Sequence, residues 1–235
     1  MRDIEKAIKK EREYLEYRAR GEEPFHLIDA IKACGFEDLD EYRKIKTDYE
    51  FNQLQFTYEE CRPDTCLSQV FQAIASGQTK FQFMISDTTF VFNCRDGFNK
   101  EFCDKHNIPI YYTETNGGTI VSTPGDVSLC ICIPANLGID DSYILSHIAS
   151  ILSKYTDKIV VDGNDILQDG RKILGSASYR QNEMYALVAH MSFNDNSNLI
   201  SQICLKPMAE KIPGSLRNIS PEQFQEEVAQ WLRIK

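Results

Sequence analysis

Hydrophobic and polar positions divide the chain into an N-terminal part with helical periodicity and a longer part that mixes strands and helices. Residues 3–20 carry dense mixed charges among spaced apolar side chains, which predicts an amphipathic helix with a solvated face. Helical spacing resumes over residues 25–45 and breaks near Gly35. The pattern therefore predicts a helical N-terminal extension over residues 1–47 and a second domain over residues 48–235.

The second domain opens with alternating apolar side chains and then changes period repeatedly. Near alternation over residues 49–58 predicts a strand, and helical spacing predicts a helix over residues 65–76. Residues 81–93 are strongly apolar except at Ser86-Asp87, which predicts two short strands joined by a turn.

Strands, turns and short helices account for the rest of the chain. Residues 119–134 predict a hairpin-like pair of strands turned by Pro124-Gly125-Asp126. Asp169-Gly170 is a strong signal for another hairpin, and Ser220 before Pro221 predicts the start of a final helix. Further helices are expected over residues 98–106 and 140–154, and further strands over residues 109–113 and 186–193. The mixture indicates an α/β (α+β) fold.

Charge and apolar content narrow the class of partner. The formal net charge is -9, whereas nucleic acids and anionic membranes are normally bound by a net-basic patch, so we expect neither as the main partner. No apolar run approaches the roughly 20 residues that span a bilayer, and the N-terminus lacks the apolar middle of a signal peptide. We therefore expect a cytoplasmic protein.

The cysteines are scattered along the chain without a secretion signal, so we expect reduced thiols. Cys61 and Cys66 form one close pair, and Cys130 and Cys132 alternate in a strand-like run. Neither pair has a second cysteine pair or a histidine at ligand spacing, so zinc is not expected.

Three polar loops interrupt the apolar strands, and loops on a rigid sheet are where sites are usually assembled. Gly117-Gly118 offers unhindered backbone N–H groups for a carboxylate or phosphate, although a simple glycine turn has the same sequence. Lys172, followed by Gly175 and Ser176, could stabilise charge on an attacking carboxylate or an acyl carbonyl, although taken alone it is most simply a surface lysine.

The order of these segments resembles the lipoate-protein ligase family within the biotin and lipoate ligase superfamily. The family pattern has NDL or NDI, then a turn, then a Lys followed by SGSA, and then a strand with HG. This chain resembles it with NDI, a turn, RKILGSA and a strand carrying His190 in the same order. TETNGGTIVSTPGD resembles the family's RRxSGGGAVYHDxGN, and KIPGSLRNISPEQF resembles its closing segment. The resemblance covers about residues 50–235 and leaves the N-terminal extension outside.

The resemblance implies a mixed central β-sheet with helices on one face and a reaction that uses ATP and Mg²⁺. Lipoate or a related acyl group would be activated as an acyl-adenylate and transferred to a lysine of a lipoyl-domain or glycine cleavage H-like carrier protein. Some family members supply an accessory domain as a separate polypeptide, which makes such a polypeptide another expected partner.

The resemblance also implies roles for individual residues. Lys172 would be the catalytic residue and would contact the acyl carbonyl and the α-phosphate. Asn164 and Asp165 would shape the nucleotide side, with Asp165 also on the metal. The expected substrate-binding residues are Asn116, Gly117, Gly118, Thr119, Gly175, Ser176, Ala177 and His190. From its sequence context alone, His190 is either part of the site wall or a satisfied core histidine.

Several positions depart from the family pattern. The family's paired arginines fall on Thr113 and Glu114, its third glycine on Thr119, its histidine on Thr123, and the glycine after the strand histidine on Met191. Each lost charged hydrogen bond should weaken binding of an anionic intermediate by roughly 1.5 to 3 kcal/mol.

Two other functions therefore stay open. A cysteine-dependent octanoyl or lipoyl transferase needs a thiol nucleophile, but residues 133–163 contain no cysteine, and a cysteine in a strand is usually buried. A noncatalytic module with a degraded site, which binds a lipoyl or related acyl group or a lipoyl-domain protein, would fit the altered arginine positions and the helical N-terminus.

Overall fold

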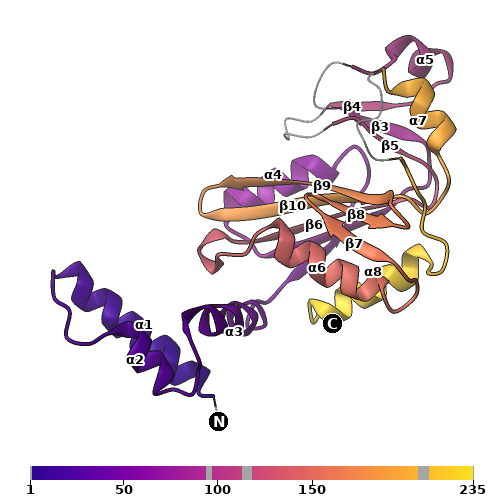
Figure 1. Ribbon diagram of the computed structural model, residues 1–235. Helices are drawn as coiled ribbons and strands as arrows, with labels where there is room; N and C mark the ends of the chain where they lie inside the picture. The colour runs from indigo at the N-terminus through magenta and orange to yellow at the C-terminus, as the bar shows by residue number, and fades with distance from the viewer. Residues whose placement is uncertain (1, 94–96, 113–117, 206–211, 235) are drawn as a thin grey trace. The chain divides into compact units, whose positions relative to one another are not determined.

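The computed structural model of the protein describes residues 2–93, 97–112, 118–205 and 212–234 (Figure 1). The chain forms two compact units, Met1–Leu54 and Gln55–Lys235. The first unit is helical, and its third helix continues to Phe51. The strand predicted from residue 49 is therefore wrong at its start, because residues 49–51 form the last part of this helix and Phe51 is buried.

The N-terminal unit consists of α1 (Ile4–Ala19), α2 (Leu27–Lys32) and α3 (Leu39–Phe51). Asp3 and Asp38 cap α1 and α3, because their side chains accept hydrogen bonds from backbone N–H groups of the first turn. The three helices enclose their own core of buried residues, which are Ala7, Ile8, Ile31, Cys34, Phe36 and Tyr42. The predicted helical extension thus has the packing of a separate small unit.

The second unit is built on a seven-stranded mixed sheet. Its strands, in spatial order, are β1 (Thr57–Glu60), β2 (Lys80–Ile85), β6 (Val127–Pro134), β10 (Met184–Met191), β9 (Arg171–Gln181), β8 (Asp165–Gln168) and β7 (Ile159–Asp162). β1 and β2 run parallel, and every other pair is antiparallel. The expected α/β fold with a mixed central sheet is confirmed.

Tight turns fix the register of three consecutive strands. Asp169 and Gly170 have φ of 50° and 75°, the left-handed conformation that a two-residue hairpin loop requires, so the hairpin predicted there is confirmed. Gly163 and Asn164 join β7 to β8 in the same way, with φ of 61° at Gly163. The two hairpins bring Asp165 next to the start of β9.

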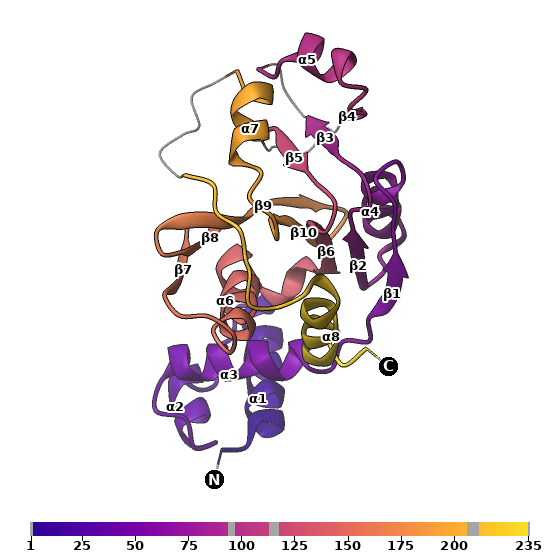
Figure 2. The same cartoon turned by 90° about the vertical axis from the view of Figure 1, so that its right-hand side faces the viewer.

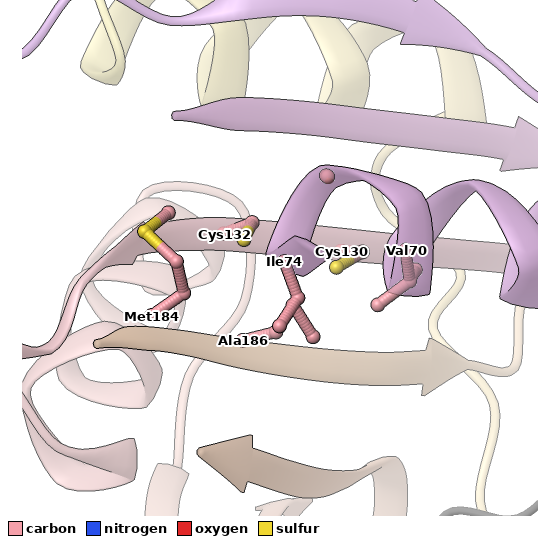
Figure 3. Packing of buried hydrophobic residues seen from close by; sticks show 7 residues of the cluster. Val70, Ile74, Cys130, Cys132, Met184 and Ala186 are labelled. Carbon is pink, nitrogen blue, oxygen red and sulfur yellow. The ribbon is translucent and has the colours of Figure 1, made fainter. Parts of the chain in front are cut away.

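One helix covers part of one face of this sheet. α4 (Cys66–Ser76) ends at Gly77, whose φ of 65° is the left-handed conformation of a C-cap, as predicted. Its Val70 and Ile74 point onto β6 and β10 (Figure 3). The buried side chains of this cluster are Val70, Ala73, Ile74, Cys130, Cys132, Met184 and Ala186. Cys130 and Cys132 are therefore core residues, as their alternation indicated.

Two further helices lie on the opposite face, which Figure 1 shows below the sheet. They are α6 (Asp141–Leu152) and α8 (Pro221–Trp231), and a short 3-10 helix, η1 (Ala135–Leu137), precedes α6. Phe224 of α8 packs against Phe83 of β2 with ring centroids 6.2 Å apart. The expectation of helices on one face describes α6 and α8, and α4 adds a partial cover on the other.

A second, three-stranded sheet lies beside the large one (Figure 2). Its order is β4 (Ile110–Tyr112), β3 (Phe90–Asn93) and β5 (Ile120–Ser122), and α5 (Lys100–Lys105) and α7 (Ser197–Ile203) pack against it. The predicted β5–β6 hairpin is wrong, because β5 pairs with β3 and β6 pairs with β2 and β10. α7 is an element that the sequence pattern did not predict.

Within the described ranges, no helix is both long and apolar enough to cross a membrane.

Candidate active site

Strand register brings four sequence-distant residues into one row across the sheet. Ser128 on β6 lies opposite His190 on β10, His190 lies opposite Gly175 on β9, and Gly175 lies opposite Asp165 on β8. Directly opposite residues of paired strands share a face. The row continues the face that α4 covers, since Cys130 and Ser128 lie two residues apart on β6.

Lys172 reaches this row although its position in the strand would normally turn it away. The register between β8 and β9 shifts at Ile166/Leu167, so Ile173 is an extra residue opposite the break. Bulges of this kind change the direction of neighbouring side chains. As a result Lys172 extends over Gly175, and its Nζ lies 2.7 Å from Oδ1 of Asp165.

Gly175 makes this position of Lys172 possible. A Cβ at residue 175 would lie 2.7 Å from both Cε and Nζ of Lys172 and 3.5 Å from Oδ1 of Asp165. Real Cβ atoms do not approach other atoms that closely, so a larger residue would displace the lysine side chain. The absence of a side chain at Gly175 in the predicted motif therefore leaves the space that the ammonium group of Lys172 occupies.

The backbone of Lys172 is fixed from its other side by residues 212–214. Its N–H donates to the carbonyl of Ile212 at 2.8 Å, and its carbonyl accepts from Gly214 at 2.7 Å. The side chain of Lys172 is 41% exposed, whereas that of Asp165 is 15% exposed. A charged donor on a fixed backbone thus faces solvent beside a mostly buried carboxylate.

Asn164, Asp165 and Ser176 are joined by the hairpin. The carbonyl oxygen of Asn164 accepts hydrogen bonds from the backbone N–H of Ser176 at 2.9 Å and from its hydroxyl at 2.8 Å. Asp162 lies directly opposite Asp165 across the turn, which places two carboxylates at one end of the sheet. Ala177 is half-buried opposite Val188, next to the core under α4.

His190 is buried, 9% exposed, in the middle of the row. Its Nδ1 lies 3.0 Å from the hydroxyl oxygen of Ser128, and its Nε2 lies 4.0 Å from Oδ2 of Asp126. Burial lowers the pKa of His190 from 6.5 to about 4; Asp126 opposes this shift and Lys172 adds to it. The imidazole is therefore neutral at physiological pH.

Asp126 joins the two sheets. Its Oδ2 accepts from the backbone N–H and the hydroxyl of Thr123, each at 2.8 Å, and from the side-chain amide of Asn196 at 3.3 Å. Its Oδ1 accepts from the backbone N–H groups of Phe193 at 2.8 Å and Asn194 at 3.4 Å. The carboxylate thereby ties the β5–β6 connection to the segment after β10.

Only the end of the predicted Gly-Gly loop lies within the described residues. Asn116 and Gly117 lie outside the described residues. Gly118 is exposed, and the hydroxyl of Thr119 donates to Oδ1 of Asn93 on the small sheet at 3.2 Å. The structure thus gathers Lys172, Asp165, Gly175 and His190, with Asn164, Ser176 and Ala177 adjoining, while Thr119 belongs to the small sheet.

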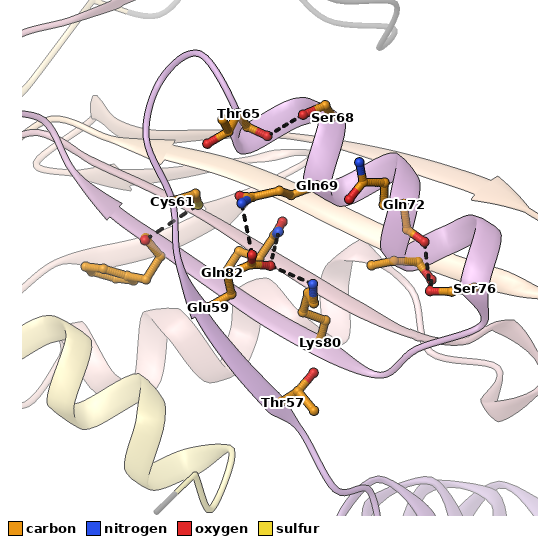
Figure 4. Close-up of polar contacts among 12 residues, drawn as sticks. Thr57, Glu59, Cys61, Thr65, Ser68, Gln69, Gln72, Ser76, Lys80 and Gln82 are labelled. Carbon is orange, nitrogen blue, oxygen red and sulfur yellow. Dashed lines mark hydrogen bonds and ion pairs between the residues drawn. The ribbon is translucent and has the colours of Figure 1, made fainter.

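Sequence reasoning missed two groups of polar residues. One consists of Ser128 and Asp126, which each lie near one ring nitrogen of His190. The only sign of this group in the sequence is a serine among the apolar residues of β6. The other lies under α4, where Glu59 accepts from Gln69 at 2.9 Å, Lys80 at 2.6 Å and Gln82 at 3.3 Å (Figure 4). The hydrogen bond from Lys80 lowers the pKa of Glu59.

Thiol and metal chemistry find little support in the described part of the chain. Burial raises the pKa of Cys132 to about 11 and that of Cys130 well above its usual range, which disfavours the nucleophilic thiolate. No group of three or more His, Cys, Asp or Glu residues in the described ranges is arranged to hold a metal ion. A cation would have to use one or two carboxylates together with its substrate.

Comparison with known proteins identifies the relatives of this fold. Residues 93–230, more than half of the chain, match the family described as the lipoyl protein ligase A/B catalytic domain. P. falciparum LipL1 in complex with lipoate is similar at 13% identity and a TM-score of 0.63, over 76% of this chain and 62% of that one. Lipoate-protein ligase A bound with ATP is similar at 14% identity and a TM-score of 0.58, over 75% and 82% of the two chains.

A bi-partite lipoate protein ligase from Thermoplasma acidophilum, analysed with its E2 lipoyl domain, is similar at 13% identity and a TM-score of 0.59, over 75% of this chain and 80% of that one. A search of curated protein sequences gave no match. Identities this low show a shared fold, and this chain spans less than two thirds of the P. falciparum protein.

Proposed function

Because the chain belongs to the lipoyl protein ligase A/B catalytic domain family, we propose that it activates lipoate or a related acyl group with ATP and transfers that group to a lysine of a carrier protein. The observation that carries the proposal is the position of Lys172, whose ammonium group lies across Gly175 and 2.7 Å from Asp165. A packed scaffold has no need of such an arrangement.

The reaction has two steps. In the first, a carboxylate oxygen of the acyl group attacks the α-phosphorus of ATP, an acyl–phosphate bond forms and pyrophosphate leaves. In the second, a neutral lysine amine of the carrier attacks the acyl carbonyl, an amide forms, AMP leaves and the amine loses a proton. Lys172 stabilises the negative charge that develops on the α-phosphate and then on the carbonyl oxygen.

Asp165 orients Lys172 before the substrates bind. Its carboxylate is mostly buried and bonded to the ammonium group, which holds the flexible lysine side chain over Gly175. Preorganised charge costs no rearrangement at the moment of reaction. The exposed side of the ammonium group is the side that remains available for an anionic substrate.

The carboxylates at the β7–β8 turn fit a Mg²⁺-bound nucleotide. Mg²⁺ is usually bound by one or two carboxylates together with substrate phosphates, and Asp162 and Asp165 lie directly opposite each other there. We assign Asp165, with Asn164 beside it, to the nucleotide side of the site. The ion would neutralise phosphate charge when the nucleotide is bound.

The proposed acceptor is a lipoyl-domain or glycine cleavage H-like carrier protein. The similarity to a bi-partite ligase analysed with its E2 lipoyl domain supports this choice. The same similarity supports an accessory polypeptide as a second partner for the adenylation step.

A noncatalytic acyl-binding module is the second candidate. It is favoured by Thr113 and Glu114, which stand where the family has paired arginines. Such a module would bind an acyl group through the same face of the sheet without forming an adenylate. A cysteine-dependent transferase is disfavoured by the buried thiols of Cys130 and Cys132.

Isothermal titration calorimetry with lipoyl-adenylate, and separately with lipoate and with ATP, tests the proposal. We expect the adenylate to bind more tightly than either substrate, because it fills the acyl and nucleotide sides together. Binding of lipoate without any binding of ATP or adenylate would favour the noncatalytic module. Binding of none of the three would refute a lipoate ligase and would favour the noncatalytic module or a different substrate.

A further inference from the structure

Ser128 and His190 form a buried polar pair inside an otherwise apolar pair of strands. Ser128 is 3% exposed and His190 is 9% exposed, and their polar atoms Oγ and Nδ1 lie 3.0 Å apart. The next residues along the same face, Cys130 on β6 and Val188 on β10, belong to the apolar cluster under α4. A buried hydroxyl is costly unless it is hydrogen-bonded, so this contact has a structural or a chemical purpose.

The other ring nitrogen of His190 has no hydrogen-bond partner within the described residues, although it is buried. Oδ2 of Asp126 is the nearest charged atom, 4.0 Å away, but it already accepts three hydrogen bonds from Thr123 and Asn196. A carboxylate oxygen has about two lone-pair directions. Asp126 is therefore saturated, and Nε2 has no acceptor among the residues that the structure describes.

The charge of Asp126 contributes to the preference of His190 for one tautomer. A negative oxygen 4.0 Å from Nε2 favours the form with the proton on Nε2 and disfavours a lone pair there. In that form Nδ1 has a lone pair, so the hydroxyl of Ser128 donates to it. The hydrogen bond from Ser128 to Nδ1 and the charge of Asp126 beside Nε2 then both favour the tautomer with its proton on Nε2.

The free N–H of His190 belongs to the same row as the reacting centre. His190 lies directly opposite Gly175, the residue over which the ammonium group of Lys172 rests. The ammonium group of Lys172 on β9 and the Nε2–H of His190 on β10 are thus two hydrogen-bond donors on neighbouring strands. The first is charged and the second is neutral. The ligand group that satisfies both is an oxygen with partial or full negative charge.

We propose that Ser128 is a positioning residue whose hydroxyl holds the Nε2–H tautomer of His190, so that His190 and Lys172 donate together to an oxygen of the acyl group. The proposal deepens, and rests on, the acyl-transfer function proposed above. Its substrate class is an acyl compound with a carboxylate or carbonyl oxygen at this place in the row. The tautomer itself is a property of the free protein and can be measured without any substrate.

The test combines ¹⁵N NMR of the histidine rings with single-turnover acyl transfer from lipoyl-adenylate to a lipoyl domain. His190→Gln assigns the His190 signals. We expect the wild type to show the Nε2–H tautomer, Ser128→Ala to lose its dominance, and Ser128→Thr to restore it. We expect the transfer rate to fall about tenfold in Ser128→Ala with little change in KM, and to recover in Ser128→Thr.

Ser86→Ala is the matched control. Ser86 is also 3% exposed and donates or accepts one buried hydrogen bond, but its partner is Ser122, not a histidine. We expect this variant to lose stability without a change in the His190 signals or in the transfer rate. An equal loss of rate in both serine variants would reduce Ser128 to a packing role and overturn the proposal.

The two readouts separate this inference from the proposed function. An unchanged tautomer in Ser128→Ala overturns the inference even if the protein is an active ligase. A tautomer that depends on Ser128 in a protein that neither binds adenylate nor transfers acyl groups supports the serine–histidine pair and refutes the ligase function.

Discussion

The two ends of one sheet face differ in chemistry although they share the same strands. Under α4, β6 and β10 contribute Cys130 and Ala186 to a buried apolar cluster (Figure 3). Two and four residues further along these strands, Ser128 and His190 stand in the row with Asp165. Strand alternation fixes which residues share the face, and the cover above it decides whether they form core or site.

The comparison also explains why charged side chains are tolerated at the polar end of this face, which contains Ser128, His190, Asp165 and Lys172. Charges are costly to bury unless they are paired or solvated. The apolar end has a helix over it, whereas Lys172 remains 41% exposed at its side chain beside the less exposed Asp165. The same sheet can therefore hold a close-packed core and a charged centre within a few residues.

Gly175→Ala should break the polar end and have the largest effect. The added Cβ would lie 2.7 Å from Cε and Nζ of Lys172, so the ammonium group must leave its place. We expect the single-turnover transfer rate to fall about 10² to 10³-fold, the range for loss of one preorganised donor. Thermal melting should change little, because a flexible side-chain end can move. A rate within about twofold of wild type would show that Lys172 does not need the glycine.

Ile74→Ala should break the apolar end instead. Ile74 is 1% exposed and packs from α4 onto the sheet, so truncation removes buried methyl groups and leaves a cavity. We expect the free energy of unfolding to fall by about 3 to 4 kcal/mol, measured by urea denaturation. The transfer rate of the folded fraction should stay near the wild-type value. A large loss of rate without loss of stability would contradict the division between the two ends.

The pH dependence of stability sharpens the comparison at His190. Its pKa is lowered from 6.5 to about 4, mainly by burial, so the unfolded chain binds a proton in this range before the folded protein does. Stability should therefore be fully present above about pH 6.5 and decline as the pH falls toward 4, by up to about 3 kcal/mol. Asp126 and Lys172 are the charged groups that act on this ring.

Urea denaturation at several pH values measures this decline. His190→Gln removes the titrating ring, so its stability should fall less steeply between pH 6.5 and 4. An equally steep decline in the variant would assign the effect to other groups.

Lys158→Ala should have the smallest effect. Lys158 and Asp169 form an ion pair of 2.7 Å, the same length as the Lys172–Asp165 pair, but their side chains are 76% and 55% exposed. Solvent screens exposed pairs, so they contribute little to stability. We therefore expect the free energy of unfolding and the transfer rate to stay near their wild-type values. A loss of rate like that in Gly175→Ala would mean that the transfer rate depends on positive charge anywhere near the hairpins, and not on the position of the Lys172 ammonium group.

Much of the fold followed from local signals in the sequence. Gly77, Asp169-Gly170 and Ser220-Pro221 mark helix ends and a hairpin through backbone conformations that few other residues adopt, and all three predictions are confirmed. The β5–β6 hairpin was wrong because Pro124-Gly125 marks a turn without saying which strands pair. Here Asp126 turns the chain from one sheet to the other.

The candidate site was predictable as motifs but not as geometry. The segments around Asp165, Lys172 and His190 resemble a family pattern, and the structure places them in one row. The bulge that turns Lys172 over Gly175 depends on the pairing of β8 with β9, which no local pattern specifies. Ser128 was missed because a single serine in a strand resembles many satisfied core hydroxyls.

The measurement that most directly tests the central claim is single-turnover transfer from lipoyl-adenylate to a lipoyl domain by wild type, Lys172→Ala and Lys158→Ala. Supplying the adenylate removes any need for an accessory polypeptide in the first step. We predict a rate at least about 10²-fold lower in Lys172→Ala, with the fold intact by circular dichroism, and a wild-type rate in Lys158→Ala. Equal rates in wild type and Lys172→Ala would contradict the assignment of Lys172 as the residue that stabilises the reacting groups.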